Sequence, residues 1–464
     1  MTSKPSPVPD VRGYPEGYSP RIPATRLPCP CSAPLRGALK STGLRVPVIL
    51  RPATVLKARD SLSSIRGSRV VLGVAGGIAA YKAADLASKL VQLGARVSVI
   101  MTESATRFVG VPTFEAITQQ PVHTSVFEQW RKDWHGHISL GQRADVIVIA
   151  PATAATLARL AHGLADDMLG AAVLSSTCPL IVAPAMEEAM YRHEATRANL
   201  EALQARGVIQ VGPEKGRLAS GELGEGRMTE PVEICGAIRQ VLGRSGALTG
   251  NRVVVTAGGT QEPLDPIRFI GNRSSGQMGY ALAQAAIDAG AAVTLISGPS
   301  CLKPPYGAKL IPVGTADDLQ AAVEEAVRGA DMLLMPAAVS DYRPETEHSQ
   351  KLKKDHLGDS LAVNLVASPD VLAGVREPGL LKIGFAAETE ALIENARKKL
   401  TAKSLDMIVA NDAAATIGSS TSQAVFLYAS GAIESLDEMP KSELAEIIVE
   451  RAIQLLQRRT PKPA

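Results

Sequence analysis

The chain has 464 residues, of which 45% are hydrophobic, 20% are charged and only 3% are aromatic. This length predicts two or three globular domains, and the scarcity of aromatic side chains argues against nucleic-acid base stacking as the main activity. The net charge of +3 is uneven, because residues 1–68 hold eleven Lys/Arg against three Asp/Glu, which leaves the remainder at −5. A mildly acidic folded part does not indicate a nucleic-acid binder.

Residues 1–68 also contain eleven of the 31 prolines and no long apolar period, which predicts a disordered extension. Its arginine excess is typical of an organellar transit peptide, but the prolines interrupt the amphipathic helix that such a peptide needs. The five cysteines are too few to suggest a disulfide framework in so long a chain, and no apolar run reaches membrane-spanning length. We therefore expect a cytoplasmic protein.

The next segment, residues 69–245, alternates strand and helix patterns. Apolar, β-branched runs predict strands at 69–75, 96–101, 144–152 and 179–186, and the segments 76–94 and 153–169 have helical periodicity. The glycine-rich segment 207–229 is predicted to be a loop or flap. This alternation predicts a parallel, doubly wound α/β sheet.

After a short linker at 243–250, residues 246–464 repeat this class of pattern without repeating the sequence. The same criteria predict strands at 252–257, 292–297, 331–336, 381–385 and 406–410, and helices at 278–289, 316–328, 389–400 and 441–458. Ligands of such sheets bind at the carboxyl ends of the strands. Residues at those ends are therefore the candidate site residues.

A glycine turn follows the first predicted strand, in the sequence GVAGGIAAYK from Gly73 to Lys82. It lacks the GxGxxG spacing, so a dinucleotide fingerprint is weakly supported. The alternative is a flavin mononucleotide (FMN) phosphate bound at the N-terminus of the following helix.

The stretch 253–279, VVVTAGGTQEPLDPIRFIGNRSSGQMG, has a fuller ligand-binding pattern. A buried strand leads into Gly258-Gly259, where the backbone can turn tightly and approach a ligand closely. Ser and Asn residues then precede the helical pattern, whose free N–H groups form an anion site. An ordinary turn before a capped helix would explain a lone glycine pair, but the convergence of Arg268, Asn272 and Arg273 favours a ligand.

The stretch 253–279 resembles the opening of the phosphopantothenate–cysteine ligase domain of bifunctional coenzyme A biosynthesis proteins. The preceding half resembles flavin-dependent cysteine decarboxylases, and the resemblance extends from residue 69 to about 455. It implies an α/β protein with two doubly wound parallel-sheet domains, flavodoxin-like or Rossmann-like. It also implies CTP-dependent ligation of 4′-phosphopantothenate with cysteine through an acyl-cytidylate. FMN-dependent decarboxylation of phosphopantothenoylcysteine to 4′-phosphopantetheine would follow. Related proteins further imply a homo-oligomer built from trimers and dimers.

For the first half, the resemblance implies that Gly76, Gly77 and Ile78 bind the FMN phosphate, and that Thr102, in the segment MTESA, lies beside the flavin. It implies that His137, in GHISL, is the catalytic histidine, a residue type suited to proton transfer near neutral pH.

Two residues of this half depart from the family pattern. Glu187 stands where the family has a substrate-binding Asn, and an ionised carboxylate cannot donate a hydrogen bond to the substrate carboxylate. Ser220 stands where the family has a proton-donating Cys, and an alcohol is a far weaker acid than a thiol, whose pKa is about 8.5. These departures leave an alternative open, in which the ligase is active and the flavin half is impaired and serves as a flavin-binding oligomerisation scaffold.

For the second half, the resemblance implies that Asn272 holds the acyl-cytidylate and that Lys351 contacts CTP and helps convert the intermediate. The further CTP contacts that it implies are Pro336, Ala337, Asp341, Ser368, Pro369, Asp370, Phe385, Lys399 and Lys403. Magnesium is expected to arrive with the triphosphate, which supplies much of the coordination, and its protein ligands are not predicted.

Overall fold

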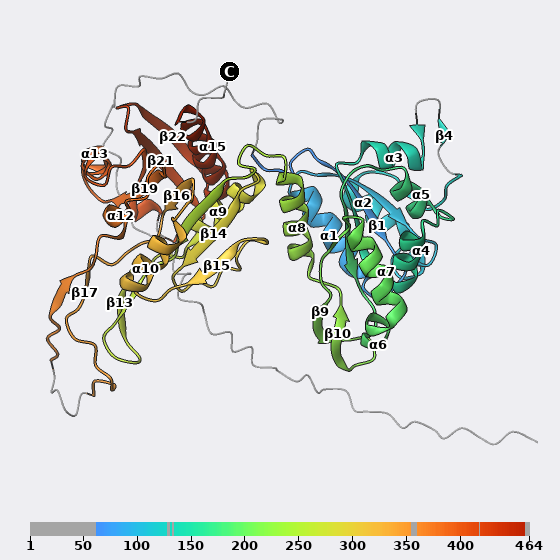
Figure 1. Ribbon diagram of the computed structural model, residues 1–464, viewed down its shortest axis with the longest axis horizontal. Coiled ribbons are helices and arrows are strands. Elements are labelled where there is room, and N and C mark those ends of the chain that lie inside the picture. Colours follow the sequence, from blue (N-terminus) through green and yellow to red (C-terminus); the bar gives the residue numbers. More distant parts are fainter. Residues whose placement is uncertain (1–61, 128–129, 132–133, 354–359, 417, 460–464) are drawn as a thin grey trace, which may run out of the picture. The chain divides into compact units, whose positions relative to one another are not determined.

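The computed structural model describes residues 62–127, 130–131, 134–353, 360–416 and 418–459. These residues form two α/β halves, each with its own central sheet (Figure 1). The disorder predicted for residues 1–61 falls outside the described residues. Residues 62–68 are described, and Ile65 is fully buried in the first core. The packed part therefore begins before the boundary predicted at residue 68.

The first half contains a six-stranded parallel sheet. Its order is β3 (Val122–His123), β2 (Arg96–Met101), β1 (Arg69–Val74), β6 (Val146–Ala152), β7 (Leu180–Pro184) and β8 (Ile209–Gln210). The central strand β6 is buried along its whole length, which explains its continuous apolar sequence VIVIAPA. The chain reverses its direction of travel across the sheet between β1 and β6, and such a switch point is where doubly wound folds bind ligands.

Helices cover both faces of this sheet. One face packs against α1 (Ala80–Gln92), α2 (Val111–Thr118) and α8 (Pro231–Gly243). The other packs against α3 (His137–Arg143), α4 (Ala154–His162), α5 (Met168–Leu174) and α7 (Glu194–Ala205). The single helix predicted at 153–169 is wrong, because α4 ends at Gly163, whose φ of 67° is left-handed.

Short elements complete this half. They are η1 (Ala105–Arg107), β4 (Trp130–Arg131), β5 (Trp134–His135) and α6 (Glu188–Arg192), with the antiparallel hairpin of β9 (Glu214–Arg217) and β10 (Leu223–Arg227). The hairpin occupies the segment predicted to be a flap. We call residues 214–227 the flap hairpin.

The second half contains an eight-stranded sheet. Its order is β15 (Lys309–Pro312), β14 (Ala292–Ser297), β11 (Arg252–Ala257), β16 (Met332–Met335), β19 (Leu381–Glu388), β20 (Met407–Asp412), β21 (Thr421–Tyr428) and β22 (Ile433–Pro440). The first six strands are parallel, whereas β21 and β22 are antiparallel. The sequence did not predict these two strands or β15. β22, IESLDEMP, is largely exposed and lacks the apolar run of a buried strand.

Helices again cover both faces of the sheet. One face packs against α9 (Gln277–Asp288) and α15 (Lys441–Arg459). The other packs against α10 (Ala316–Ala326), α12 (Val371–Gly374) and α13 (Leu392–Ala402). The remaining elements are α14 (Ala413–Thr416) and two hairpins, β12 (Gln261–Pro263) with β13 (Phe269–Gly271) and β17 (Tyr342–Pro344) with β18 (Leu365–Ala367). Here the switch point lies between β11 and β16.

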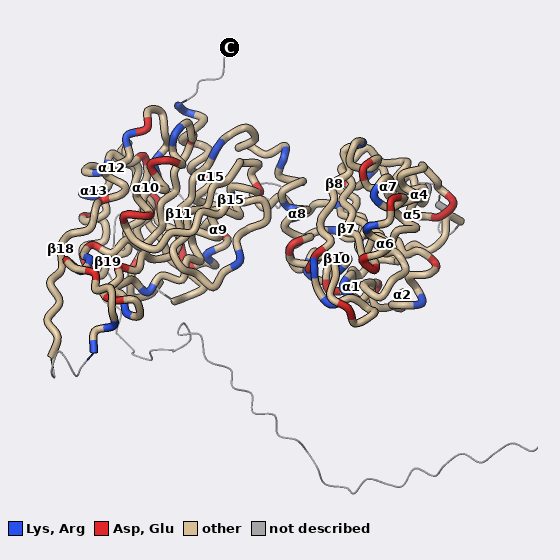
Figure 2. Tube along the Cα trace, turned by 60° about the horizontal axis from the view of Figure 1, so that its bottom comes forward, with Lys and Arg blue, Asp and Glu red and all other residues tan. Residues whose placement is uncertain are grey.

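The surface carries charges of both signs. Figure 2 shows Lys/Arg and Asp/Glu positions interspersed along both halves rather than gathered by sign. Within the described residues, no helix is both long enough and apolar enough to cross a membrane.

Candidate functional sites

The first candidate site is the turn between β1 and α1, at the switch point of the first sheet. A Cβ added to Gly76 would lie 2.5 Å from the Cβ of Ser104, so this position requires glycine. Ser104 follows β2, and its hydroxyl lies 3.4 Å from that of Thr102, which is buried. The predicted flavin residues of two separate strands are thus brought together at one edge of the sheet.

The N-terminus of α1 in this turn has the properties of an anion site. Its N-cap is Ala79, and no described side chain caps the helix. A Cβ on Gly77 would come no closer than 3.6 Å to its nearest neighbour, Thr153 Cγ2, and Ile78 is 64% exposed. The turn is therefore open. Ala80 and Lys82 donate their N–H groups to the carbonyls of Gly77 and Ala79, and the N–H groups of residues 76–79 remain available to a phosphate. These residues fit the phosphate of FMN.

Glu187 and Ser220, the two departures from the family pattern, contact each other. The backbone N–H of Ser220 donates to Glu187 Oε1 at 3.1 Å, and the Ser220 hydroxyl donates to Oε2 at 3.1 Å. Glu187 directly precedes α6, and Ser220 lies at the tip of the flap hairpin. The carboxylate that was expected to face the substrate is therefore engaged by the flap.

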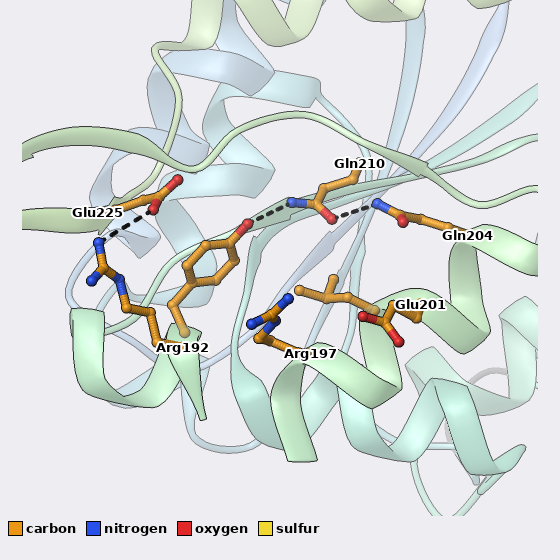
Figure 3. Close-up of a pocket in the computed structure, with 8 residues that line it drawn as sticks. Arg192, Arg197, Glu201, Gln204, Gln210 and Glu225 are labelled. Carbon is orange, nitrogen blue, oxygen red and sulfur yellow. Dashed lines mark hydrogen bonds and ion pairs between the residues drawn. The ribbon is translucent and has the colours of Figure 1, made fainter. Parts of the chain in front are cut away.

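Two further contacts hold the flap hairpin against the segment around α6. The N–H of Met186 donates to the Gly226 carbonyl at 3.0 Å. A Cβ on Gly226 would lie 2.0 Å from the Met186 carbonyl, so only glycine allows this approach. At the C-terminal end of α6, the guanidinium of Arg192 lies 4.0 Å from Oε2 of Glu225 in β10 (Figure 3).

The cleft drawn in Figure 3 has a volume of about 510 Å³ and lies between α6, α7 and the flap hairpin. Its side chains largely satisfy one another: Gln210 donates to the Tyr191 hydroxyl at 3.0 Å and accepts from Gln204 at 2.9 Å. It is lined by none of the residues predicted to bind flavin or substrate. We therefore do not assign the predicted chemistry to this cleft.

His137 is the first residue of α3, and its carbonyl accepts a hydrogen bond from Ser175 Oγ at 3.1 Å. Its side chain is half-buried. It lies on a different element from the Glu187–Ser220 pair, and its predicted catalytic role remains a prediction.

The second candidate site is a cavity of about 390 Å³ at the switch point of the second sheet. Six of the predicted nucleotide-site residues line it, namely Asn272, Pro336, Ala337, Asp341, Phe385 and Lys399. They come from the loop before α9, the loop after β16, strand β19 and helix α13. The sequence therefore identified a set of residues that the fold brings together from four places in the chain.

The N-terminus of α9 forms part of this cavity wall. Its N-cap is Gly276, with a φ of 80°, and no described side chain caps the helix. Gly276, Gln277, Met278 and Gly279 all line the cavity. Uncapped N–H groups and the helix dipole give this wall a positive potential. The Asn272 side chain donates to the Ala338 carbonyl at 3.2 Å, which fixes the amide at the cavity wall.

The two lysines predicted to meet the triphosphate are paired with acids. Lys399 Nζ lies 2.7 Å from Glu388 Oε1, and Lys403 Nζ lies 2.9 Å from Asp370 Oδ1. Burial raises the pKa of Asp370, but the hydrogen bonds from Lys403 and from the Ala373 N–H, together with the charges of Lys403 and Lys399, outweigh it and the net pKa is lowered. Lys403 and Asp370 do not line the cavity.

Ser368, Pro369 and Lys351 are also outside the lining of the cavity. Ser368 is connected to it, because its N–H donates to the carbonyl of Asp341 at 2.9 Å. Lys351 is exposed and precedes Leu352, whose N–H donates to Asp265 and whose carbonyl accepts from Arg268. The start of the predicted lysine loop is thus anchored to the loop that leads into β13.

The cavity also contains residues that sequence reasoning missed, including Asn411, Thr416 and Lys441. Lys441 begins α15 and is 9% exposed. In the sequence it is a lysine without a recognisable motif, and only the fold places it beside α9.

Residues 58–243 match the family model described as Flavoprotein. Residues 248–456 match the model described as DNA/pantothenate metabolism flavoprotein C-terminal domain.

Among curated proteins, the chain is 42% identical over 397 residues to the coenzyme A biosynthesis bifunctional protein CoaBC of Bacillus subtilis, covering 84% of this chain and 97% of that one. It is 45% identical to the protein of the same name from Mycolicibacterium smegmatis, and the match covers 74% of this chain and 86% of that one.

Among solved structures, the C-terminal domain of a CoaBC protein is 36% identical, with 46% of this chain and 100% of that chain covered and a TM-score of 0.41. The FMN-binding protein AtHal3 is 34% identical, with a TM-score of 0.34. The match covers 38% of this chain and 96% of that chain.

Proposed function

Because the chain belongs to the family of coenzyme A biosynthesis bifunctional proteins, we propose that its two halves catalyse successive reactions. The second half joins 4′-phosphopantothenate to cysteine, using CTP, and the first half decarboxylates the product. The alternative, an impaired flavin half that serves only as a scaffold, finds no support in family membership. We propose a cytoplasmic enzyme that assembles from trimers and dimers.

In the ligase reaction, the carboxylate of 4′-phosphopantothenate attacks the α-phosphate of CTP and displaces pyrophosphate. The amine of cysteine then attacks the acyl-cytidylate and displaces CMP. Both steps bring polyanions together, so the site must supply positive potential. The uncapped N-terminus of α9 in the wall of the second cavity is the observation that carries this proposal.

Individual residues of this cavity have distinct proposed roles. Asn272, held by the Ala338 carbonyl, would donate to the acyl-cytidylate. Asp341 would accept from the ribose, and Phe385 would pack against the nucleotide. Lys351 would act from outside the described lining, by movement of its loop toward the bound nucleotide. Magnesium would be held mainly by the triphosphate.

In the decarboxylase reaction, bound FMN would supply the two-electron chemistry that prepares the cysteinyl group for loss of its carboxylate. The open N-terminus of α1 would hold the phosphate of the flavin. His137 would transfer protons, and the flap hairpin would cover the substrate. The contact between Glu187 and Ser220 supports a closed flap in which the hydroxyl of Ser220 has a fixed position.

Product analysis tests the whole proposal. The purified protein is incubated with 4′-phosphopantothenate, cysteine, CTP and magnesium, and CMP, phosphopantothenoylcysteine and 4′-phosphopantetheine are followed separately. We expect all three products and a visible flavin absorbance spectrum. Absence of CMP would contradict the ligase assignment. Formation of CMP with neither flavin absorbance nor phosphopantetheine would support the ligase assignment and contradict the decarboxylase assignment.

A further inference from the structure

Lys441 is a buried cation in the wall of the second cavity. It directly follows β22 and is the first residue of α15, a helix of 19 residues. Its side chain is 9% exposed, and its ammonium donates to the carbonyl of Thr416 at 3.1 Å. Both Lys441 and Thr416 line the cavity.

The charge of Lys441 is not neutralised by a carboxylate of the described chain. No Asp or Glu among the described residues lies within ion-pair distance of its ammonium, whereas Lys399 in the same cavity is paired with Glu388 at 2.7 Å. Burial lowers the pKa of the Lys441 ammonium. A buried ammonium is costly without a counter-charge, and its place at a helix N-terminus adds the repulsion of the helix dipole.

The surroundings of Lys441 do not offer that counter-charge but increase the positive potential. The uncapped N-terminus of α9 lines the same cavity, and so does Arg273. Asp341 is the one acidic residue in the described lining, against Arg273, Lys399 and Lys441. A cavity of this kind is completed by an anionic ligand.

We propose that Lys441 binds a phosphate group of the ligase substrates in this cavity, together with the N-terminus of α9. This inference rests on the proposed ligase function, which brings two phosphate-bearing ligands to the site, CTP and 4′-phosphopantothenate. A different role would be purely structural, in which the ammonium only ties α15 to the Thr416 carbonyl.

The test compares Lys441→Met with a matched control, Lys382→Met. Lys382 is also partly buried, its ammonium also donates to a backbone carbonyl, that of Lys403 at 3.0 Å, and burial also lowers its pKa. It does not line the cavity. Both variants lose an ammonium and a bond to a carbonyl, but only Lys441→Met would lose a phosphate contact.

Affinity is measured by calorimetry on the full chain with CTP, cytidine and 4′-phosphopantothenate separately. We expect Lys441→Met to weaken the binding of one phosphate-bearing ligand by about tenfold to a hundredfold, the range of a charge-assisted hydrogen bond. Loss confined to CTP would identify the nucleotide phosphates, and loss confined to 4′-phosphopantothenate would identify its phosphate. Cytidine binding and the Lys382→Met protein should be unchanged.

Unchanged affinity of Lys441→Met for both phosphate-bearing ligands would overturn the inference. If Lys441→Met does not fold, Lys441→Gln removes the charge while keeping an N–H donor for the Thr416 carbonyl, and the same affinities decide the question. Lys441→Arg, which keeps the charge, should bind more tightly than Lys441→Gln. A wild-type protein that binds neither CTP nor 4′-phosphopantothenate would instead contradict the proposed ligase function.

Discussion

The two halves share one sheet order around the switch point and an uncapped helix N-terminus beside it, α1 or α9, but they differ in whether charged side chains near the site are already paired. In the first half, the acid Glu187 is satisfied by Ser220 of the flap hairpin, and Arg192 by Glu188 at 2.6 Å. In the second half, a buried ammonium and an uncapped helix end face the same cavity. The fold thus provides only the edge of the sheet at which a ligand binds. The segments that cover this edge decide whether charge is left for the ligand.

The largest effect is expected from Asn272→Ala, which removes a donor from the wall of the second cavity. We expect ligase turnover to fall about a hundredfold, as is typical when one positioned donor to a reacting group is lost. CMP release from CTP measures the effect, and decarboxylation of added phosphopantothenoylcysteine should be unchanged. The control is Asn395→Ala, because Asn395 also donates to a backbone carbonyl, that of Glu390 at 3.1 Å, but lies outside the cavity lining. Equal ligase turnover in the two variants would show that the Asn272 side chain does not act in the ligase reaction.

A smaller effect is expected from Lys351→Gln. Loss of the Lys351 charge should slow the ligase about tenfold, at the level of one charge-assisted contact, while CTP binding remains measurable. Stopped-flow detection of pyrophosphate and CMP separates activation from amide formation. Lys353→Gln is the control, since Lys353 is an exposed neighbour two residues away. If both variants behave as the wild type, this loop is only a solvated surface.

The double variant Glu187→Asn with Ser220→Cys is expected to raise decarboxylase activity by a few-fold, whereas the two variants above lower ligase activity. A thiol is the better proton donor and an amide can donate to the substrate carboxylate, so phosphopantetheine output should rise. Glu187→Asn alone should instead loosen the flap, because Ser220 donates to two carboxylate oxygens of Glu187, whereas the shorter amide has one acceptor oxygen. Tryptic cleavage after Arg217, an exposed residue of β9, reports this loosening without turnover.

The matched control for the flap is Glu201→Ala, an exposed glutamate of α7 beside the cleft of Figure 3 that leaves Ser220 untouched. A double variant no faster than the wild type would show that another residue supplies the proton. Tryptic cleavage of Glu187→Asn at the wild-type rate would show that the flap does not depend on the Glu187–Ser220 contact.

The smallest effect concerns pH. The Arg268 side chain, together with backbone N–H groups, holds the pKa of Asp265 well below its usual range. A carboxyl group whose pKa is lowered on folding stabilises the folded protein at pH values above its pKa in the unfolded chain, which is about 4. This stabilisation is lost as the pH falls from there toward the lower pKa of the folded state. The stability difference between wild type and Asp265→Asn, measured by urea unfolding, should therefore shrink between pH 5 and pH 3. A constant difference would contradict the linkage.

The sequence predicted the central parallel strands because their apolar runs are buried, as in β6 and β11, but it missed the short parallel strands β3, β8 and β15. It missed β22 because an exposed antiparallel edge strand carries polar residues. Six residues that were predicted to bind the nucleotide line the second cavity, and each belongs to a motif that the sequence shows. Lys441 has no motif, and its position follows from the packing of α15 on α9. The Glu187–Ser220 contact joins residues 33 apart through a hairpin whose geometry the sequence does not encode locally.

The turn after β11 is built from main chain against main chain. A Cβ on Gly298 would lie 2.4 Å from the Gly259 carbonyl, and one on Gly258, whose φ is 76°, would lie 3.0 Å from the Gly298 carbonyl. Because these contacts join backbone atoms of glycines, any substitution adds a Cβ where there is no room, and no smaller change of side chain is possible. In evolutionary terms this turn is tightly constrained, and a lineage that changes ligand preference must do so through side chains that line the cavity, such as Asn411 and Met278. Libraries for altered nucleotide use belong at those positions.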